Sequence, residues 1–288
     1  MIRSDTGTSR NPLDQDAHEF HYNPQHAFPD FASHRARRAP ANEAALAALR
    51  READIPYGKH PRHRLDLYPA ERPGAPIHIF FHGGYWLANS KDGFAFVAAA
   101  LVRRGFAVVV PNYELCPDST LDGVVGSAIA AVEWVTRQGG RIGADPNAIS
   151  LSGHSAGAHL CAAVLAHDWT GIGLSQGFLR GATLISGIYD PAPAIRTTIN
   201  EDLRLDTATA ARHDYERAPV RADAGVHLFA GGREPWRWID GTFRYAHHLR
   251  RSGGDPEVHV LPGYDHFKIL DEYMAEDGPV LRAIARYV

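Results

Sequence analysis

A serine between two glycines carries the strongest chemical signal in this sequence. Ser155 is the central residue of Gly153-His154-Ser155-Ala156-Gly157, which follows an apolar run and precedes an Ala-rich helical pattern. This pattern also occurs in ordinary turns, but at a strand-to-helix turn the glycines let the serine hydroxyl project from the sheet. The N–H of Ala156 then lies at a helix N-terminus, where positive partial charge gathers. We therefore predict that Ser155 is a nucleophile and that Ala156 helps to bind an oxyanion.

Two further glycines supply the remaining donors of the expected oxyanion hole. Gly83 and Gly84 follow the nearly continuous apolar run Ile77–Phe81, which predicts a strand buried on both faces. Paired glycines at the carboxyl end of a strand let the backbone approach a ligand with its N–H groups exposed. A glycine hairpin is the alternative, but the usual Pro-Gly or Asn-Gly dipeptide is absent. We predict that the N–H groups of Gly83 and Gly84 complete the oxyanion hole.

A carboxylate and a histidine follow later strands of the chain. Glu234 comes after the apolar run Val226–Ala230, and His266 comes after Glu257–Leu261. The order serine, acid, histidine is that of an α/β-hydrolase, in which the histidine activates the serine and the acid orients the histidine. We predict a catalytic triad of Ser155, Glu234 and His266.

Two other carboxylates compete with Glu234 for the role of the acid. Asp240 lies further along after the same strand and is expected inside the next helix, which would carry its side chain away from the sheet edge. Asp190 follows the predicted strand Ala182–Gly187, which comes too early in the chain for the usual order. Both carboxylates remain alternatives on the sequence alone.

Aromatic side chains flank these predicted catalytic groups. Tyr85 and Trp86 follow the paired glycines, and Trp236 and Trp238 follow the expected acid. Aromatic walls bind an aryl group by offset stacking. We predict that these four residues bind substrate, with simple packing in a core or cap as the alternative.

Alternating strands and helices would bring these residues together. Continuous apolar runs predict buried strands, and alternating polar and apolar residues predict an edge strand. Apolar residues spaced three and four positions apart predict helices. Besides those named, the expected strands are Arg64–Tyr68 at an edge, Phe106–Val110 and Ile149–Leu151, and the expected helices are Leu121–Arg137, Ala156–Ala166 and Tyr245–Arg251. This order predicts an α/β-hydrolase fold with a mostly parallel central sheet, helices on both faces, a small cap, and a site beyond the carboxyl ends of the strands.

The segments outside this pattern are expected at the termini and over the site. Residues 1–16 are polar without periodicity and predict a flexible N-terminus, so that residues 17–288 form a single domain. Aromatics and prolines in His18–Phe31 predict an irregular segment, and Ala39–Ala53 predicts a helix; within residues 17–60 they form an N-terminal roof. Residues 191–220 predict a cap insertion that lines the pocket.

Composition excludes several classes of partner. The 288 residues carry a net charge of −3 with both signs mixed along the chain, which does not fit nucleic-acid binding. No apolar run approaches the roughly 18 residues of a membrane span, and the first residues lack the apolar core of a signal peptide. We expect a cytoplasmic protein with a small-molecule substrate that carries an aryl group and without membrane contact; a homodimer stays open.

Neither the cysteines nor the histidines indicate a disulfide or a metal. Cys116 and Cys161 are expected to be buried free thiols, since a reduced compartment is the simpler explanation for two cysteines. Among the 17 histidines, His18-Glu19-Phe20-His21 and His247-His248 lack the i, i+4 spacing that directs two imidazoles at one ion. We expect no metal and no other cofactor.

Five motifs of this chain occur together in a known family. They are His82–Trp86, Asn112–Pro117, Gly153–Leu160, Ser186–Asp190 and Asp265–Phe267, and together they resemble the kynurenine formamidase (arylformamidase) branch of the α/β-hydrolases. The resemblance implies hydrolysis of an N-formyl aryl amide, such as N-formylkynurenine to kynurenine and formate, by a serine nucleophile without metal. The chain departs from the family after the acid, where Pro235-Trp236-Arg237-Trp238 stands instead of Pro-Glu-Phe or similar.

Two other functions are compatible with the same motifs. A broad carboxylesterase that cleaves short-acyl aryl esters would use the same catalytic groups and differ only in the shape of its pocket. A hydrolase fold that has become a non-catalytic binding protein is expected to have lost a member of the triad, whereas all three positions are filled here.

Overall fold

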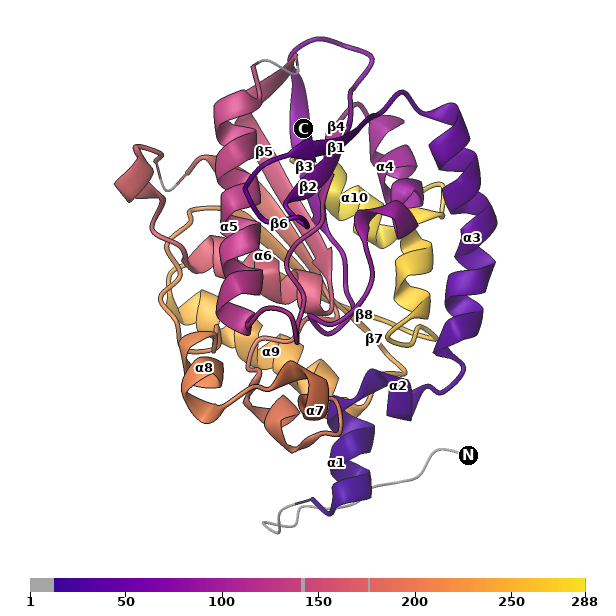
Figure 1. The fold of residues 1–288 in the computed structure, drawn as a ribbon, viewed down its shortest axis with the longest axis vertical. Coiled ribbons are helices and arrows are strands. Elements are labelled where there is room, and N and C mark those ends of the chain that lie inside the picture. The colour runs from indigo at the N-terminus through magenta and orange to yellow at the C-terminus, as the bar shows by residue number, and fades with distance from the viewer. Residues whose placement is uncertain (1–12, 141–142, 176, 288) are drawn as a thin grey trace.

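A twisted sheet of eight strands runs through the centre of the molecule. The computed structural model describes residues 13–140, 143–175 and 177–287 (Figure 1). The strands lie in the order β1-β2-β4-β3-β5-β6-β7-β8, and all neighbours from β4 to β8 pair in parallel. The strands are β1 (Glu52–Pro56), β2 (Arg64–Tyr68), β3 (Ala75–Phe81), β4 (Ala107–Pro111), β5 (Ala144–His154), β6 (Leu179–Ile185), β7 (Gly225–Gly231) and β8 (Glu257–Leu261). The predicted mostly parallel sheet is confirmed.

The edge of the sheet differs from the prediction. We expected Arg64–Tyr68 at the edge, but β1 pairs outside it in antiparallel register, and β2 itself pairs antiparallel with β4. Strand β1 is short, contains two acidic residues and is mostly exposed, so its sequence carries none of the periodicity by which a strand is recognised. Asp66 of β2 is consequently buried, and Arg51 and Lys91 form ion pairs with its carboxylate.

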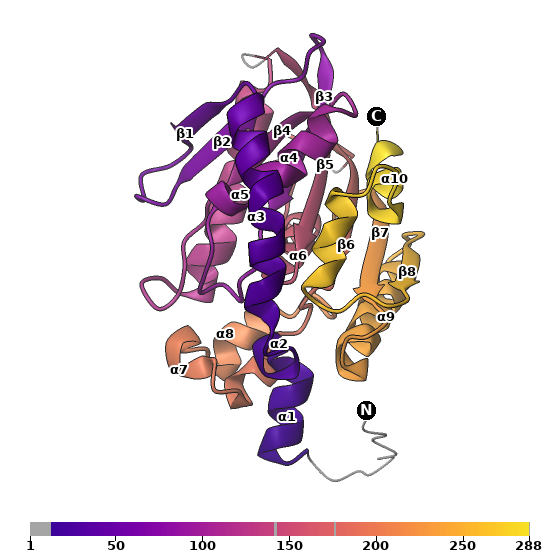
Figure 2. The ribbon, with the colours of Figure 1, turned by 90° about the vertical axis from the view of Figure 1, so that its right-hand side faces the viewer.

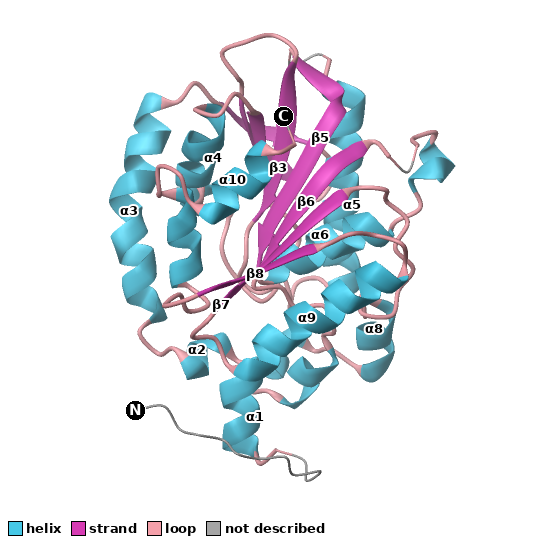
Figure 3. Ribbon diagram, turned by 180° about the vertical axis from the view of Figure 1, so that it is seen from behind, coloured by secondary structure: helices cyan, strands magenta, loops and turns pink. Residues whose placement is uncertain are grey.

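Helices cover both faces of the sheet, as predicted. On one face α5, α6 and α9 pack over the central strands, and on the other α3, α4 and α10 do so (Figure 3). The apolar residues of these helices and of the sheet form two cores, one on each face. The α-helices are α1 (Gln15–Tyr22), α2 (Pro24–Ala27), α3 (Phe31–Ala48), α4 (Ala95–Val102), α5 (Leu121–Gln138), α6 (Ala156–Ala166), α7 (Asn200–Leu203), α8 (Thr207–Arg212), α9 (Trp236–Arg251) and α10 (Pro279–Ala285); the short 3-10 helices are Lys91–Gly93, Trp169–Ile172, Ala192–Arg196 and Lys268–Tyr273.

The N-terminal segment is helical where we predicted irregular chain. Helix α1 begins at Gln15, inside the predicted flexible terminus, because the Asp14 carboxylate caps it by accepting a hydrogen bond from Ala17 N at 2.8 Å. The Asn23 side chain caps α2 in the same way. Helix α3 begins eight residues before the predicted helix and ends five before its end. Residues 1–12 of the predicted flexible terminus lie outside the described part of the chain.

These helices lie against the segment that we predicted as a cap. Figure 2 shows α1 and α2 next to α7 at the lower end of the molecule. The Glu19 carboxylate accepts hydrogen bonds from the backbone and side chain of Thr198, and the His18 ring lies 2.8 Å from the carbonyl oxygen of Pro193. Two segments far apart in sequence therefore meet beyond the sheet.

Two smaller expectations are settled by the described residues. Cys116 and Cys161 are buried free thiols, as predicted. None of the helices in the described ranges combines the length and the apolar character that crossing a membrane requires.

Candidate active site

Ser155 lies at a strained turn between β5 and α6. Its backbone has φ 55° and ψ −117°, in a region that residues with a side chain seldom adopt. A Cβ at Gly153 would lie 2.3 Å from the Gly157 carbonyl oxygen, and one at Gly157 would lie 2.0 Å from that of Phe81. Only glycine fits at either position, and the turn is further held by a 2.8 Å hydrogen bond from Ser155 N to Ile185 O. Glycines stand two residues before and two residues after Ser155 because any side chain there would collide with neighbouring backbone, as expected from the sequence.

The predicted oxyanion donors surround this serine. A Cβ on Gly83 would lie 3.3 Å from Ser155 Cβ and 2.9 Å from the His154 carbonyl oxygen, so the Gly83 backbone passes directly beside the serine. Gly84 has φ 129°, where L side chains are strained, and a Cβ there would lie 2.3 Å from Ala88 O. Ala156 is the first residue of α6, where N–H groups have no partner within the helix. This arrangement can bind a negatively charged oxygen at Ser155.

A buried histidine holds the glycine loop in place. The Tyr113 hydroxyl donates to the His82 carbonyl at 2.7 Å, and the two rings stack with centroids 4.3 Å apart. The Phe94 ring also stacks on His82, with centroids 5.5 Å apart. Burial lowers the pKa of His82 to about 4, so this ring is neutral at pH 7. His82 therefore packs and positions the loop and carries no charge.

Glu234 and His266 form a buried pair. Glu234 Oε1 lies 2.6 Å from His266 Nδ1, and both side chains are almost completely excluded from solvent. The second oxygen, Oε2, accepts hydrogen bonds from Gly231 N at 2.8 Å and from the Ser186 hydroxyl at 3.0 Å. With its lone pairs occupied in this way, the carboxylate can hold the imidazole in a single orientation with Nε2 available for proton transfer.

Main-chain bonds join the two loops that carry this pair. Gly232 N donates to Leu261 O and Arg233 N donates to Tyr264 O, at 2.8 and 2.9 Å. The loop after β7 is thereby tied to the loop after β8, because the two strands are neighbours in the sheet.

The two competing carboxylates have other partners. Asp240 lies within α9 and forms an ion pair with Arg244 one turn later. Asp190 accepts a hydrogen bond from Ala192 N at 2.9 Å. The structure thus brings Glu234, and neither Asp240 nor Asp190, to the ring of His266.

The four aromatic residues predicted to bind substrate have different surroundings. The rings of Trp238 and His266 are arranged edge to face with centroids 4.7 Å apart, and the Trp238 N–H donates to Ser186 O at 2.8 Å. Tyr85 is half-buried and donates its hydroxyl to Tyr22 O at 2.7 Å. Both line a pocket that meets the candidate catalytic pair at Trp238, although Ser155, Glu234 and His266 are not themselves among its lining residues. Trp236 is 46% exposed and Trp86 is fully buried against His159, and neither lines this pocket.

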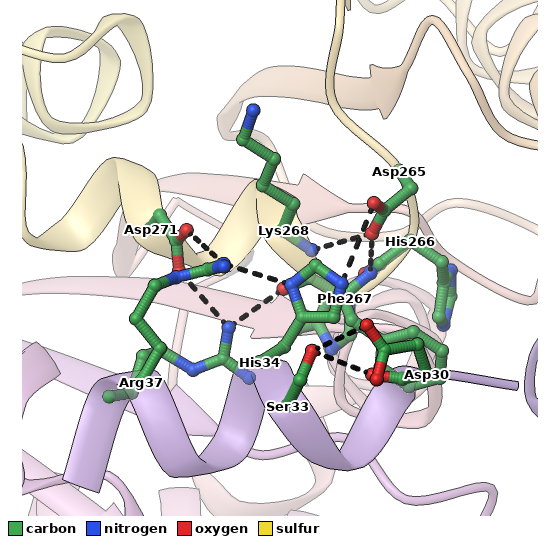
Figure 4. A network of polar contacts seen from close by, with 11 residues as sticks. Asp30, Ser33, His34, Arg37, Asp265, His266, Phe267, Lys268 and Asp271 are labelled. Carbon is green, nitrogen blue, oxygen red and sulfur yellow. Dashed lines mark hydrogen bonds and ion pairs between the residues drawn. The ribbon is translucent and has the colours of Figure 1, made fainter. Parts of the chain in front are cut away.

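A polar network fastens the His266 loop to α3 (Figure 4). The Asp265 carboxylate accepts hydrogen bonds from the backbone N–H groups of Phe267 and Lys268 at 2.9 and 2.8 Å and lies 3.6 Å from His34. Arg38 of α3 donates to the Phe267 carbonyl at 2.9 Å. The predicted roof therefore contributes side chains that position His266.

Two positioning residues were missed in the sequence analysis. His154, within the serine pentapeptide, places Nε2 2.7 Å from the His266 carbonyl oxygen, and burial together with the nearby His266 keeps its pKa well below the usual range. Ser186 has φ 49° at the end of β6 and binds Glu234. A serine at a strand end is too common a pattern to reveal such a role, whereas the position of His154 inside the motif was a usable signal.

The pocket combines aromatic walls with charged groups. Its lining includes Tyr22, Tyr85, Asp190, Arg237 and Trp238, together with the ion pair of Glu216 and Arg244. Arg237 stacks on Trp236 at 4.5 Å and has no carboxylate partner among the described residues. Asp190 likewise has no cationic partner in the described part of the chain. One cation and one anion therefore remain available to a ligand.

Known proteins resemble this chain over much of its length. It is 35% identical over 289 residues to kynurenine formamidase of Danio rerio, covering 96% of this chain and 97% of that protein. It is 26% identical over 232 residues to kynurenine formamidase of Drosophila melanogaster, covering 77% and 76%.

Solved structures agree on the fold. A candidate thioesterase from Silicibacter sp. superposes with a TM-score of 0.82 at 25% identity, covering 95% of this chain and 99% of that one. An esterase of Pyrobaculum calidifontis gives a TM-score of 0.69 at 20% identity, covering 88% and 92%. Residues 78–269 match the family described as alpha/beta hydrolase fold. The chain therefore belongs to the alpha/beta hydrolase fold family.

Proposed function

We propose that this hydrolase cleaves an aryl formamide that resembles N-formylkynurenine, with Ser155 as nucleophile. The observation that supports it most is the strained turn at Ser155 at the same sheet edge as the buried pair of Glu234 and His266. In this proposal His266 takes the Ser155 proton while the hydroxyl oxygen attacks the formyl carbon. The negative charge that develops on the formyl oxygen is stabilised by the N–H groups of Gly83, Gly84 and Ala156.

The second half of the reaction uses the same groups. His266 returns the proton to the arylamine, which leaves, and water then releases formate from the formylated Ser155 with His266 again acting as base. Glu234 stays ionised and holds the imidazolium. No group beyond those described is needed for the atoms and protons to balance.

The pocket supports a substrate with an amino acid side arm. Tyr85 and Trp238 offer aromatic walls for the aryl ring. Arg237 and Asp190 have opposite charges and lack ionic partners among the described residues, which complements the carboxylate and ammonium of an α-amino acid. The relatives named kynurenine formamidase support the same substrate class.

A carboxylesterase acting on short-acyl aryl esters is the second candidate. It is favoured by the esterase among the structural neighbours and needs no charged group in the pocket. Under it, Arg237 and Asp190 have no role in binding.

The deciding experiment compares kcat/KM for N-formylkynurenine, formanilide and p-nitrophenyl acetate. We expect the first to be the best substrate, and Arg237→Gln to raise its KM about tenfold or more while leaving formanilide within a factor of about two. Ser155→Ala should abolish turnover of all three while binding stays within a few-fold. Preference for the acetate ester would favour the carboxylesterase, and undiminished activity of Ser155→Ala would exclude nucleophilic catalysis by this residue.

A further inference from the structure

Two histidines and a glutamate gather on the last two strands, away from the candidate active site. His227 lies near the start of β7, and Glu257 and His259 lie at the start of β8. His227 is paired with Glu257 in the strand register, and all three side chains share one face of the sheet. The candidate catalytic residues follow the carboxyl ends of the strands, so this cluster lies at the opposite end of the sheet. Figure 2 shows β8 at the edge of the sheet, next to β7.

The three side chains direct their ligand atoms at one point. Glu257 Oε2 lies 3.6 Å from His227 Nδ1 and 3.7 Å from His259 Nε2, and the three atoms are all within 4.8 Å of one another. Ligands of a tetrahedral zinc ion lie about 3.3 Å apart, given metal bonds of about 2.0–2.2 Å. The two distances from Glu257 Oε2 exceed this by a few tenths of an ångström, and the two imidazole nitrogens lie within 4.8 Å of each other, so an ion would bind after small rotations of the partly exposed Glu257 and His259 side chains.

Both nitrogens lack a hydrogen-bond partner within the described residues. His227 is 4% exposed, and its Nδ1 is buried without a donor or acceptor in bonding distance. The Nε2 atom of His259 is in the same state. A buried polar nitrogen without a hydrogen bond costs free energy, and an ion bound by the nitrogen would offset that cost.

Neighbouring side chains fix the cluster from outside. Arg286 donates to the other carboxylate oxygen of Glu257, Oε1, at 2.5 Å, so that Oε2 faces the two imidazoles. The His259 ring stacks on Phe229 with centroids 4.5 Å apart. The carboxylate and His259 are partly exposed, with 44% and 35% of each side chain accessible, so an ion and its water can enter from solvent.

A second cluster of the same composition already has hydrogen bonds at its facing atoms. His60, His63 and Glu114 also lie together, but His63 Nε2 is already bonded to Glu114 at 3.0 Å and to the Ser127 hydroxyl at 3.0 Å. The other Glu114 oxygen accepts a hydrogen bond from Ser119. His63 Nδ1 is buried without a hydrogen-bond partner in the described residues, as His227 Nδ1 is, but His63 Nε2 and both oxygens of Glu114 are already hydrogen-bonded without an ion.

We propose that His227, Glu257 and His259 bind one divalent transition-metal ion, with water as the fourth ligand. Two imidazole nitrogens and one carboxylate oxygen suit zinc and its neighbours and not magnesium or calcium, which prefer oxygen ligands. The ion joins the edge strand β8 to β7 and lies outside the proposed reaction. The proposal concerns binding and stability, and it does not depend on the proposed function.

The test is zinc binding to protein that has been stripped with a chelator and dialysed. Isothermal titration with Zn²⁺ should give one saturable site per chain, no site for Mg²⁺, and a higher melting temperature with zinc. Glu257→Gln and His259→Gln should each weaken binding at least about tenfold, since loss of even an outer-shell partner costs that much in affinity.

Matched variants separate this site from the other histidines. His60→Gln and His266→Ala should bind zinc as the unmodified protein does, and Glu257→Gln should turn over substrate at the unmodified rate. Binding that disappears in His60→Gln or His266→Ala instead, or that persists unchanged in both Glu257→Gln and His259→Gln, would overturn the proposal. Loss of formamide hydrolysis in His266→Ala is expected from the proposed function and leaves the zinc result unaffected, whereas loss of it in Glu257→Gln would contradict the placement of the ion outside the reaction.

Discussion

The two oxygens of Glu234 have separate tasks. One faces His266, and the other is held by Ser186 and by the backbone of Gly231. A neutral amide at this position would keep the shape but could offer its NH₂ group to the wrong partner. The orientation of the imidazole therefore depends on the charge and on both anchors.

Replacing Glu234 by Gln should reduce kcat at least about a hundredfold, because an amide favours the wrong imidazole tautomer; the corresponding change in a chymotrypsin-type serine protease lowers kcat by about 10⁴. Asp240→Asn and Asp190→Asn are the controls, and neither should lower kcat appreciably because neither side chain contacts His266. Steady-state measurement of kcat for the three variants shows which carboxylate orients His266. A crippled Asp240→Asn beside an active Glu234→Gln would contradict the assignment of the acid.

Two of the tryptophans should respond differently to truncation. Trp238→Ala removes a pocket wall and a ring contact with His266, so KM for an aryl formamide should rise much more than KM for ethyl formate. Trp86→Ala should lower stability by about 3–5 kcal/mol without changing the ratio of the two KM values, since this side chain is fully buried in the core. Denaturant unfolding and kinetics on both substrates separate these effects. An equal rise of KM for both substrates in Trp238→Ala would show that this side chain only packs and does not bind the aryl group.

At the scale of elements, the His266 loop depends on α3 as well as on β8. Asp265 bonds two successive backbone N–H groups of the loop, and His34 and Arg38 of α3 reach the same loop. Roof and sheet thus position the histidine jointly.

Asp265→Ala should lower kcat about ten- to a hundredfold with little change in KM, because a displacement of the imidazole by about 1 Å is enough for such a loss. Asp265→Asn keeps an oxygen acceptor and should restore most of the rate. The measurement is kcat and KM of both variants alongside their melting temperatures. If both variants keep the unmodified rate, the loop holds its shape without the hydrogen bonds of the Asp265 carboxylate.

At the scale of the whole molecule, buried neutral histidines set the response to acid. Burial lowers the pKa of His78 and His159 to about 3 and that of His82 to about 4. The unfolded chain takes up protons at these rings below a pKa of about 6.5, whereas the folded chain does not until pH falls to about 3–4. The free energy of unfolding therefore decreases as pH falls through this window.

Between pH 7.5 and 5.5 the three rings together should remove on the order of 4 kcal/mol of stability, at up to about 1.4 kcal/mol per ring and pH unit. Denaturant midpoints at both pH values, in EDTA to exclude bound metal, measure the loss. His78→Gln should make the pH dependence shallower. A midpoint that does not move between the two pH values would contradict the account.

Much of the fold could be predicted from the sequence because its signals are local. The apolar runs of β3, β4 and β7, the helical spacing of α5 and α6, and the glycines around Ser155 each reflect contacts or backbone angles within a short stretch. The positions of Ser155, Glu234 and His266 after the carboxyl ends of β5, β7 and β8 also predicted that these residues reach one edge of a parallel sheet.

The remaining features depend on contacts between distant segments and could not be read from the sequence. The short, exposed strand β1 exists because β2 offers it an open edge, and the segment predicted as irregular is helical at α1 because it packs beside Thr198 and Pro193. The orientation of helix α9 decided which of the aromatic residues faces the pocket. The hydrogen bonds between the loops after β7 and β8 decided which carboxylate lies against His266. Local propensity carries no information on such pairings, because their free energy comes from burial and hydrogen bonds that form only when the chain has folded.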